Sequence, residues 1–430
     1  MKFRRLSTFV QENGFLRLGA GHRYTPIKAA VILGRAPKRI VAWFLSGRRQ
    51  TCTLVAAIVL ALGGMSHAQY SVIYSFTGGD SGAGPQGLTK DGSGNLYGFS
   101  GGGTYGAGTI FNLTHNGSGW HFHSLYTFLG SFEGATDGAN PVGLIVGVDG
   151  NLYGTTEFGG NSSFCGTVFR VTTSGNETVL YRFHGGDDGC KPTGGVVSDA
   201  AGNLYGTTTV GGAYNSGTIF RLRRSGNNYS ESVVYSFNGL GHGGDPVAGL
   251  TFDSSGNLWG TTCGGLVPVV FELTPSGNGW TYQVISGIGE PLGGCPNSPL
   301  VDGGSGVFYG TLNTGGQNGD NVFQVKNGVV SDIALEGRSN APPAPVTLVK
   351  DSSTVLYGIA TQTAYCGTIF KLTRQAGTWT SMDIHHFDSN YECTPNANSP
   401  WSILEMDNVL YGTASSGGPL GYGAIWKYAP

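Results

Sequence analysis

The sequence predicts an all-β fold made of seven copies of one four-stranded unit. Three observations support this: a repeat near 50 residues, a turn-rich composition, and a last copy whose missing strand stands at the start of the array. An aromatic residue followed by glycine marks each copy, and successive steps lie 56, 52, 54, 50, 48 and 54 residues apart. The steps are Tyr97-Gly98, Tyr153-Gly154, Tyr205-Gly206, Trp259-Gly260, Tyr309-Gly310, Tyr357-Gly358 and Tyr411-Gly412. Such a period is typical of closed β arrays, so we predict a seven-bladed β-propeller of four-stranded antiparallel blades.

The composition favours turns and short strands over solvated helices. The 430 residues include 76 glycines, and only 12% are charged. Ordinary globular chains have about 7% glycine and about 25% charged residues. Aromatic residues still make up 11% of the chain, which is enough large apolar surface to build a core and to argue against disorder.

Each copy contains four β-type segments, which we call A, B, C and D. In the second copy they run from Val142 to Val146, Asn151 to Thr156, Thr167 to Thr172 and Thr178 to Phe183. The link from A to B is a tight turn with an aspartate in every copy. These residues are Asp91, Asp149, Asp199, Asp253, Asp302, Asp351 and Asp407. Aspartate accepts hydrogen bonds from nearby backbone in such turns, so we interpret the seven as turn formers and not as catalysts.

The two ends of the array predict how it closes. The mature chain begins with a lone D-type segment, Ser71 to Phe76, and ends after a C-type segment, Ala424 to Tyr428. The first segment can therefore complete the last blade, which shortens the exposed sheet edges. An open solenoid with capping repeats, or two stacked β domains, are the alternatives.

Residues 1–68 differ in charge from the rest. They hold 11 Lys and Arg against the single acid Glu12, which leaves 13 basic and 25 acidic side chains in residues 69–430, a net charge of −12. The apolar run from Leu54 to Gly64, followed by Ser66-His67-Ala68, is typical of a signal peptide. A membrane anchor is the alternative, but the run is shorter than the roughly 20 residues that span a bilayer.

We therefore expect residues 1–68 to be a basic leader and signal peptide, and residues 69–430 to form a single propeller domain. The protein would be secreted, either extracellular or periplasmic, and would have no transmembrane span after cleavage. Its acidic body argues against nucleic acid as a partner, because phosphate binding needs clustered Lys and Arg.

Six cysteines follow the leader, and 15 pairings are formally possible. Three fall in B-to-C loops and three in the D-to-A loops that follow, and both kinds of loop emerge on one face of an antiparallel blade. We predict the pairs Cys165 with Cys190, Cys263 with Cys295, and Cys366 with Cys393. Free thiols or a metal site are the alternatives, although zinc sites usually contain a close cysteine pair that this chain lacks.

The blade motif resembles a known bacterial family. The pattern Gly-Asn-Leu-Tyr-Gly followed by Gly-Thr-Ile-Phe spans residues 94–98 and 108–111, and near copies span 150–154 with 166–169 and 202–206 with 217–220. It resembles the GloVer tandem repeat, whose members are exported and carry varied C-terminal anchors. A weaker similarity is to the NHL and lactonase-type propellers. The resemblance implies an exported repeat protein and brings no activity with it.

Acidic residues recur in the D-to-A loops, close to the start of the innermost strand. They are Asp80, Asp137, Asp188, Asp245 and Asp388. We predict a ligand-binding role for them, as a partial acidic rim at the axial opening that would hold sugar hydroxyls or calcium. The alternative is that they are solvated turn residues. No other cofactor and no further metal site is expected.

Three functions remain open at this stage. We expect a monomeric, non-enzymatic module that binds carbohydrate or a surface protein at its long loops, where binding residues usually lie on a rigid scaffold. A glycan- or lactone-active enzyme with acids at the axial pocket is the first alternative. A structural component of the cell surface or matrix is the second, because propellers host many functions.

Overall fold

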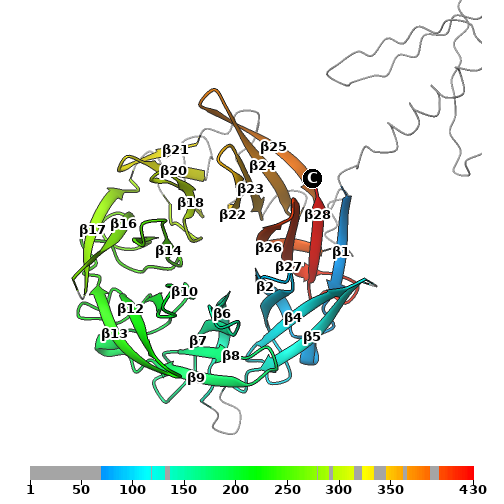
Figure 1. The fold of residues 1–430 in the computed structure, drawn as a ribbon, viewed down its shortest axis with the longest axis horizontal. Helices are drawn as coiled ribbons and strands as arrows, with labels where there is room; N and C mark the ends of the chain where they lie inside the picture. Colours follow the sequence, from blue (N-terminus) through cyan, green and yellow to red (C-terminus); the bar gives the residue numbers. More distant parts are fainter. Residues whose placement is uncertain are drawn as a thin grey trace, which may run out of the picture. The chain divides into compact units, whose positions relative to one another are not determined.

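The computed structural model describes residues 69–430 except 118, 131–135, 278, 290–293, 314–321, 334–344, 362–365 and 388–396. Its strands form seven antiparallel sheets of four strands each, arranged around a common centre (Figure 1). The A-type strand of each sheet lies innermost and the D-type strand lies outermost (Figure 1). The predicted seven-bladed propeller is therefore confirmed. Among the described residues, no helix is both long and apolar enough to cross a membrane.

We number the blades in chain order. Blades 1 to 3 consist of β2 (Ala83–Lys90), β3 (Leu96–Gly101), β4 (Thr109–Asn116) and β5 (Gly119–Thr127); β6 (Ala139–Val146), β7 (Leu152–Phe158), β8 (Thr167–Val171) and β9 (Glu177–Arg182); and β10 (Val196–Ser198), β11 (Leu204–Thr208), β12 (Thr218–Ser225) and β13 (Asn228–Ser236). Blades 4 and 5 consist of β14 (Thr251–Phe252), β15 (Leu258–Thr261), β16 (Val269–Ser276) and β17 (Gly279–Gly287); and β18 (Val301–Gly304), β19 (Val307–Thr311), β20 (Val322–Lys326) and β21 (Val329–Asp332).

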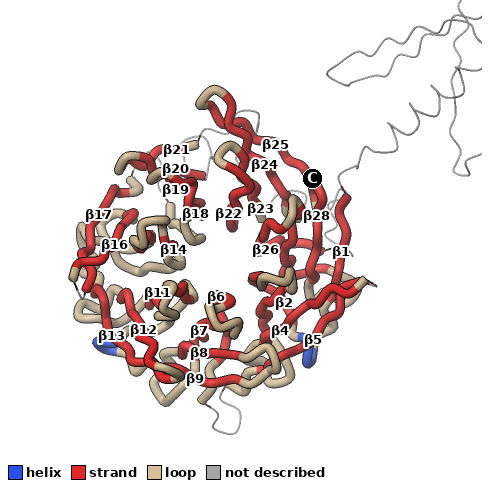
Figure 2. Tube along the Cα trace, viewed as in Figure 1, coloured by secondary structure: helices blue, strands red, loops and turns tan. Residues whose placement is uncertain are grey.

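Blade 6 consists of β22 (Pro345–Ser352), β23 (Val355–Ala360), β24 (Thr368–Gln375) and β25 (Thr378–His386). Blade 7 combines β26 (Ala397–Met406), β27 (Val409–Gly417) and β28 (Ala424–Ala429) with β1 (Gln69–Ser75) from the start of the described chain. Two short 3₁₀ helices, η1 (Gly79–Ser81) and η3 (Gly186–Asp188), lie in D-to-A loops and are the helical segments drawn in Figure 2.

The ring closes by strand pairing, as predicted. β1 runs antiparallel to β28, with Tyr70 opposite Tyr428 and Ser75 opposite Ala424. The backbone N–H of Phe76 then donates to the Gly423 carbonyl oxygen at 2.9 Å. Segments more than 340 residues apart in the printed sequence therefore share one sheet, and blade 7 exists only when both are present.

The glycine of each aromatic-glycine step is explained by packing inside the blade. In blade 2, Gly154 on β7 lies opposite Phe169 on β8. A Cβ atom on Gly154 would lie 2.7 Å from the Phe169 ring, closer than side chains approach one another. The same collision with an aromatic ring on the third strand occurs at the glycine of every other blade. Glycine is therefore needed at this step because a phenylalanine or tryptophan ring fills the space that a side chain would occupy.

Aromatic rings also join each blade to the next. Phe128, which follows β5, packs edge-on against Phe169 of blade 2 with ring centroids 5.1 Å apart. Phe183 makes the same contact with Phe220 of blade 3, also at 5.1 Å. All four rings are fully buried. Such edge-to-face pairs contribute to stability beyond the area that they bury, so the core of this fold lies between blades as much as within them.

Two of the predicted disulfides are confirmed. Cys165 bonds Cys190 and Cys263 bonds Cys295, with Cα atoms 4.4 and 4.9 Å apart. Each pair joins a B-to-C loop to the D-to-A loop that follows it, which is the arrangement that the repeat positions predicted. Cys366 is also disulfide-bonded, while its predicted partner Cys393 lies outside the described residues.

Removal of a closure side chain should destabilise the whole ring. Phe76, which directly follows β1, is 1% exposed, whereas Val72 on β1 is 38% exposed. Phe76→Ala should lower the free energy of unfolding by about 3 to 5 kcal/mol, because it empties a packed site. Val72→Ala should cost less than about 1 kcal/mol. Denaturant unfolding of both variants tests this, and equal losses would contradict the importance of closure.

The disulfide between the β7–β8 loop and the β9–β10 loop should stabilise the fold chiefly through the unfolded chain. It links residues 25 apart in sequence, so Cys165→Ser combined with Cys190→Ser should cost about 3 kcal/mol. The double variant is the correct test because a single serine would leave a free thiol. Reductant should lower the unfolding midpoint of the native chain by more than it lowers that of the double variant. An unchanged midpoint in the double variant would refute this.

Candidate functional site

The two faces of the ring differ in their connections. We call the face with the A-to-B and C-to-D links the tight-turn face, and the face with the B-to-C and D-to-A links the long-loop face. The D-to-A loop between β9 and β10, for example, spans residues 183–195, whereas the C-to-D turn of the same blade spans 172–176. We therefore describe each candidate site residue by the face on which it lies.

Five of the seven predicted turn aspartates, Asp91, Asp149, Asp199, Asp253 and Asp302, accept hydrogen bonds from their own hairpins. In blade 3, Asp199 Oδ1 accepts hydrogen bonds from the backbone N–H groups of Ala201 (3.0 Å) and Asn203 (2.9 Å). Its Oδ2 accepts from the Asn203 amide at 2.8 Å and from the Tyr205 hydroxyl at 3.2 Å. Asp91 and Asp253 repeat this arrangement. These carboxylates are occupied in shaping the hairpins.

The hydrogen bonds also determine the charge state of these turns. Burial alone would raise the pKa of Asp253, but hydrogen bonds from Trp259, Asn257 and Ser255 outweigh it and lower the pKa below its usual value. The same balance lowers the pKa of Asp91. The folded-state pKa thus lies below the unfolded one, so these turns stabilise the fold above about pH 4 and lose that contribution as the pH falls further.

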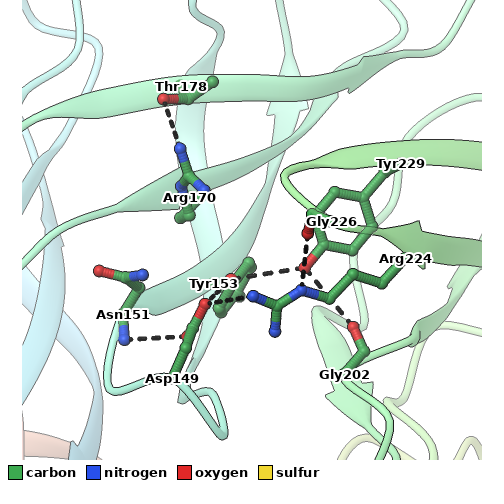
Figure 3. A network of polar contacts seen from close by, with 9 residues as sticks. All are labelled: Asp149, Asn151, Tyr153, Arg170, Thr178, Gly202, Arg224, Gly226 and Tyr229. Carbon is green, nitrogen blue, oxygen red and sulfur yellow. Dashed lines mark hydrogen bonds and ion pairs between the residues drawn. The ribbon is translucent and has the colours of Figure 1, made fainter.

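One tight-turn aspartate also joins two blades. Asp149 Oδ2 of blade 2 forms an ion pair with Arg224 Nη2 of blade 3 at 3.1 Å and accepts the Tyr153 hydroxyl at 2.8 Å (Figure 3). The Tyr229 hydroxyl lies 3.4 Å from that of Tyr153 and reaches the Gly202 carbonyl oxygen. A shallow hollow lies beside this network. The Asp149 carboxylate and the Tyr153 and Tyr229 hydroxyls all form hydrogen bonds within the protein, so we interpret the network as structural.

Two of the predicted ligand-binding acids face the outer strands. Asp137 is 7% exposed, and its Oδ2 accepts the Tyr126 hydroxyl at 2.7 Å and the Leu129 N–H at 2.8 Å. Asp188 Oδ2 accepts the Tyr181 hydroxyl and the His184 N–H, both at 2.9 Å. Each aspartate therefore ties its D-to-A loop back to the tyrosine of the outermost strand.

The same position in the first D-to-A loop is a serine. Ser81 Oγ accepts the Thr77 N–H at 3.1 Å, as Asp137 and Asp188 accept the equivalent N–H groups. The position thus serves as a loop clamp in three successive loops, whether or not it carries charge. The sequence carries a signal for this role, because Ser81, Asp137 and Asp188 each follow a Tyr-x-Phe pattern. The signal is hard to recognise because the number of residues between the pattern and the clamp differs among the loops.

The remaining predicted acids are dispersed. Asp80 accepts a hydrogen bond from Thr104 and so links a D-to-A loop to the neighbouring B-to-C loop. Asp245 is exposed, and its backbone has φ +48°. Asp388 lies outside the described residues. Within the described part of the chain, no three or more His, Cys, Asp or Glu side chains are grouped so as to hold a metal ion.

Exposed apolar side chains gather on the long-loop face, which sequence reasoning did not anticipate. Five aromatic ones are Tyr105, Phe158, Phe164, Tyr214 and Tyr422. Five aliphatic ones are Val210, Leu240, Leu266, Val267 and Leu420. All lie in or beside B-to-C and D-to-A loops of blades 7, 1, 2, 3 and 4, which are consecutive in the ring. We call these ten residues the apolar rim. The described tight turns expose only Val148 and Val329 of this class.

One rim residue has an unusual backbone. Phe164 is exposed and has φ +53°, a region that bulky side chains seldom adopt. Its N–H donates to the Asn161 carbonyl oxygen at 3.1 Å, and the next residue, Cys165, is held by a disulfide. Strain of this kind persists where surrounding bonds enforce it and is frequent in ligand-binding loops.

A tryptophan on an innermost strand is also exposed. Trp401 lies on β26, where a register shift between Pro400 and Ser402 leaves it without an opposite residue on β27. Its side chain is 44% exposed. The bulge follows Pro400, and β2 has the same irregularity after Pro85.

The chain matches the family model described as the Gloeobacter/Verrucomicrobia repeat over residues 64–267 and 229–426. The protein belongs to this family. The resemblance inferred from the Gly-Asn-Leu-Tyr-Gly motif is therefore confirmed. No curated protein matches the chain.

Solved structures share the fold at low sequence identity. The extracellular domain of a protein assigned as a hybrid two component system from B. thetaiotaomicron is 12% identical, with a TM-score of 0.52 over 85% of this chain and 41% of that one. PorZ, a surface component of the type-IX secretion system of Porphyromonas gingivalis, is 13% identical, with a TM-score of 0.51 over 80% of this chain and 46% of PorZ. The chain spans less than half the length of either. A protein assigned as a 6-phosphogluconolactonase from Bacteroides uniformis is 14% identical, with a TM-score of 0.45 over 77% of this chain and 88% of that one.

The Asp turns should contribute to stability in proportion to their hydrogen bonds. Asp253→Ala removes the acceptor of four hydrogen bonds and should cost about 1 to 3 kcal/mol of unfolding free energy. Asp351 holds the corresponding repeat position of blade 6, near the end of β22, and is exposed, so Asp351→Ala serves as the matched control with a loss below about 0.5 kcal/mol. Thermal unfolding at pH 7 compares them. Similar losses of unfolding free energy in both variants would show that the hydrogen bonds of Asp253 do not determine its contribution to stability.

Proposed function

We propose that this member of the Gloeobacter/Verrucomicrobia repeat family is an exported propeller that binds another protein through its long-loop face. The observation that carries the proposal is the apolar rim. Leu266 is 76% exposed and Tyr214 is 65% exposed, and both lie in B-to-C loops, next to one another in blade order. Exposed apolar groups that gather on one face of a soluble protein are typical of interaction surfaces.

The residue types in the rim favour a protein partner. Half of the rim is aliphatic, and leucine and valine side chains gain by contact with another apolar surface and not by contact with sugar hydroxyls. Tyrosine is enriched at the energetically important centres of protein interfaces. The rim also extends over five blades, which suits a broad, shallow contact more than a pocket for a small molecule.

The scaffold holds the rim in position before binding. Phe164 adjoins the disulfide between Cys165 and Cys190, and Leu266 lies three residues from Cys263 of the second disulfide. Restricting loops in the unbound state reduces the entropy lost on association. The disulfides therefore support binding as well as stability.

The setting of the related structures is compatible with this proposal. One neighbour is described as an extracellular domain and another as a bacterial surface component. The disulfides of this chain likewise favour an oxidising compartment outside the cytoplasm. We therefore propose that the partner is met at or beyond the cell surface.

Carbohydrate binding is a second candidate, favoured by Trp401 alone. An exposed indole ring on an innermost strand offers a flat apolar surface against which a sugar ring can stack. A site of this kind would depend on Trp401 and not on the rim, so the two candidates can be separated by mutation.

The test compares two sets of charge insertions in the full chain. Tyr214→Glu with Leu266→Glu places charge on the rim, and Val148→Glu with Val329→Glu places it at equally exposed apolar sites on the tight-turn face. Partners captured from the surface fraction of the producing bacterium should be identified, purified and measured by calorimetry. We expect the rim variant to weaken the affinity by at least tenfold, or about 1.4 kcal/mol, and the control to leave it unchanged.

Several outcomes would contradict protein binding at the rim. One is that the rim variant and the tight-turn variant both bind the partner with the native affinity. Another is that both variants lose the same amount of affinity. A glycan array on which the native chain binds sugars, and Trp401→Ala alone does not, would favour the carbohydrate candidate instead. Circular dichroism of every variant confirms that the fold survives.

A further inference from the structure

The outermost strand of each blade presents one side chain to the blade before it. This position is fixed by the sheet register, because it pairs with the same apolar residue of the third strand. Phe122 lies opposite Leu113, Glu177 opposite Val171, Glu231 opposite Leu222, and Tyr282 opposite Leu273. We call it the junction position. Comparison of blades 1 to 4 at this position shows two kinds of junction.

Aromatic stacking fills the junction before blade 1 and the junction before blade 4. Phe122 stacks on Tyr74, with centroids 4.0 Å apart and planes at 2°. Tyr282 stacks on Tyr235 at 3.8 Å and 8°. Each junction is closed by two flat rings and contains no carboxyl group at this position.

A glutamate replaces the aromatic ring at the junctions before blades 2 and 3. Glu177 of β9 occupies the position next to Tyr126, and Glu231 of β13 occupies the position next to Tyr181. The blades remain close there, since a Cβ atom on Gly175 would lie 2.5 Å from the Leu125 carbonyl oxygen. These two tyrosines are also the ones whose hydroxyls donate to Asp137 and Asp188. An acid on the loop therefore accompanies an acid on the next blade in both cases.

One oxygen of each carboxyl group in these junctions lacks a donor. Asp137 Oδ1 and Glu177 Oε1 are buried atoms with no hydrogen-bond partner, and the same is true of Asp188 Oδ1 and Glu231 Oε1. A buried acceptor without a donor is costly, and two neighbouring carboxylates also repel. One proton on each glutamate would remove the repulsion and supply a donor.

The surrounding charges are few. Burial first, and then Asp137, raise the pKa of Glu177 to about 7, while Arg182 acts in the opposite direction. Arg182 is itself bound to Thr136 in the Asp137 loop. Burial first, and then Asp188, raise the pKa of Glu231 to about 7. His184 Nδ1 lies 3.3 Å from Asp188 Oδ2, and the Tyr181 hydroxyl also contacts Asp188 in this junction.

We propose that the junctions before blades 2 and 3 are pH-sensitive contacts, in which Glu177 and Glu231 are protonated in mildly acidic solution and the blades separate more readily once those protons leave. The aromatic junctions on either side hold the ring together independently of pH. Opening would thus be confined to the part of the ring that contains blade 2, whose D-to-A loops lie on the long-loop face.

The sign of the effect follows from linkage. The folded-state pKa of each glutamate lies above the unfolded value of about 4.5, so the folded protein binds more protons between these values. The stabilisation is complete below about pH 4.5 and is lost as the pH rises through about 7. This is opposite to the effect of the tight-turn aspartates, which act at more acidic pH.

The experiment measures the melting temperature of the full chain from pH 4.5 to 8. Glutamine imitates the protonated acid, so Glu177→Gln with Glu231→Gln should melt like the native chain near pH 5. At pH 8 it should melt roughly 2 to 4 °C higher than the native chain. Glu405→Gln is the control, because Glu405 accepts the Asn408 N–H at a tight turn. The difference in melting temperature between this variant and the native chain should not change from pH 4.5 to 8.

A second pair of variants guards against a folding defect caused by glutamine. Glu177→Phe with Glu231→Tyr copies the aromatic junctions and should likewise melt with less dependence on pH. Hydrogen exchange, corrected for the intrinsic rate, should show β9 and β13 losing protection at pH 8 in the native chain while β17 keeps it.

Three results would overturn the proposal. One is a melting difference between native and glutamine chains that is constant from pH 4.5 to 8. Another is unchanged protection of β9 and β13. The third is a melting temperature at pH 8 that rises with millimolar calcium in the native chain but not in the glutamine variant, because it would make the junctions cation sites.

Discussion

The pairing of β1 with β28 is the contact on which the rest of the structure depends. Each blade buries one face against the blade before it and one against the blade after it, so an open array would leave two apolar faces in water. The antiparallel ladder from Gln69–Ala429 to Ser75–Ala424 removes both ends at once. It does so with backbone hydrogen bonds, which depend little on side-chain identity, and this allows the seven blades to diverge in sequence while the ring persists.

Closure also explains why the junctions between blades can vary. Buried phenylalanine pairs, such as Phe128 with Phe169, supply an apolar contact at the junctions before blades 1 to 4. Outside that contact, the junction position holds a stacked aromatic ring in some blades and a glutamate in others. His385 stacked on Tyr70 is a further solution, and burial lowers the pKa of this histidine to about 4. A closed ring tolerates these differences because each junction is supported by all the others.

The two faces divide stability and recognition between them. The tight-turn face uses its carboxylates internally, as at Asp149 and Asp199, and leaves few groups for a ligand. The long-loop face carries the disulfides, the loop clamps and the apolar rim. This division follows from antiparallel topology: the short hairpins must all emerge on one side, which leaves the longer connections, and the freedom to vary them, to the other.

The sequence by itself determined the blade count, the hairpin turns, the closing strand and two cysteine pairs, because each follows from a local pattern that repeats with a fixed period. The Asp-x-x-Gly-Asn signature folds on itself within a few residues, so its role could be predicted without knowledge of its neighbours. The predicted ligand-binding role of the loop acids could not be judged in this way, because Asp137 and Asp188 take their partners from outer strands and their orientation depends on the path of each loop.

Only the tertiary structure decided which residues meet between blades. Glu177 lies 40 residues from Asp137 in the chain, and nothing in its local sequence distinguishes it from a solvated strand residue. The rim residues likewise lie in separate glycine-rich loops, and they form one surface only because the ring turns those loops to the same side. Contacts of this kind arise from packing of one repeat on the next, and a period in the sequence predicts that repeats stack but not which side chains come together.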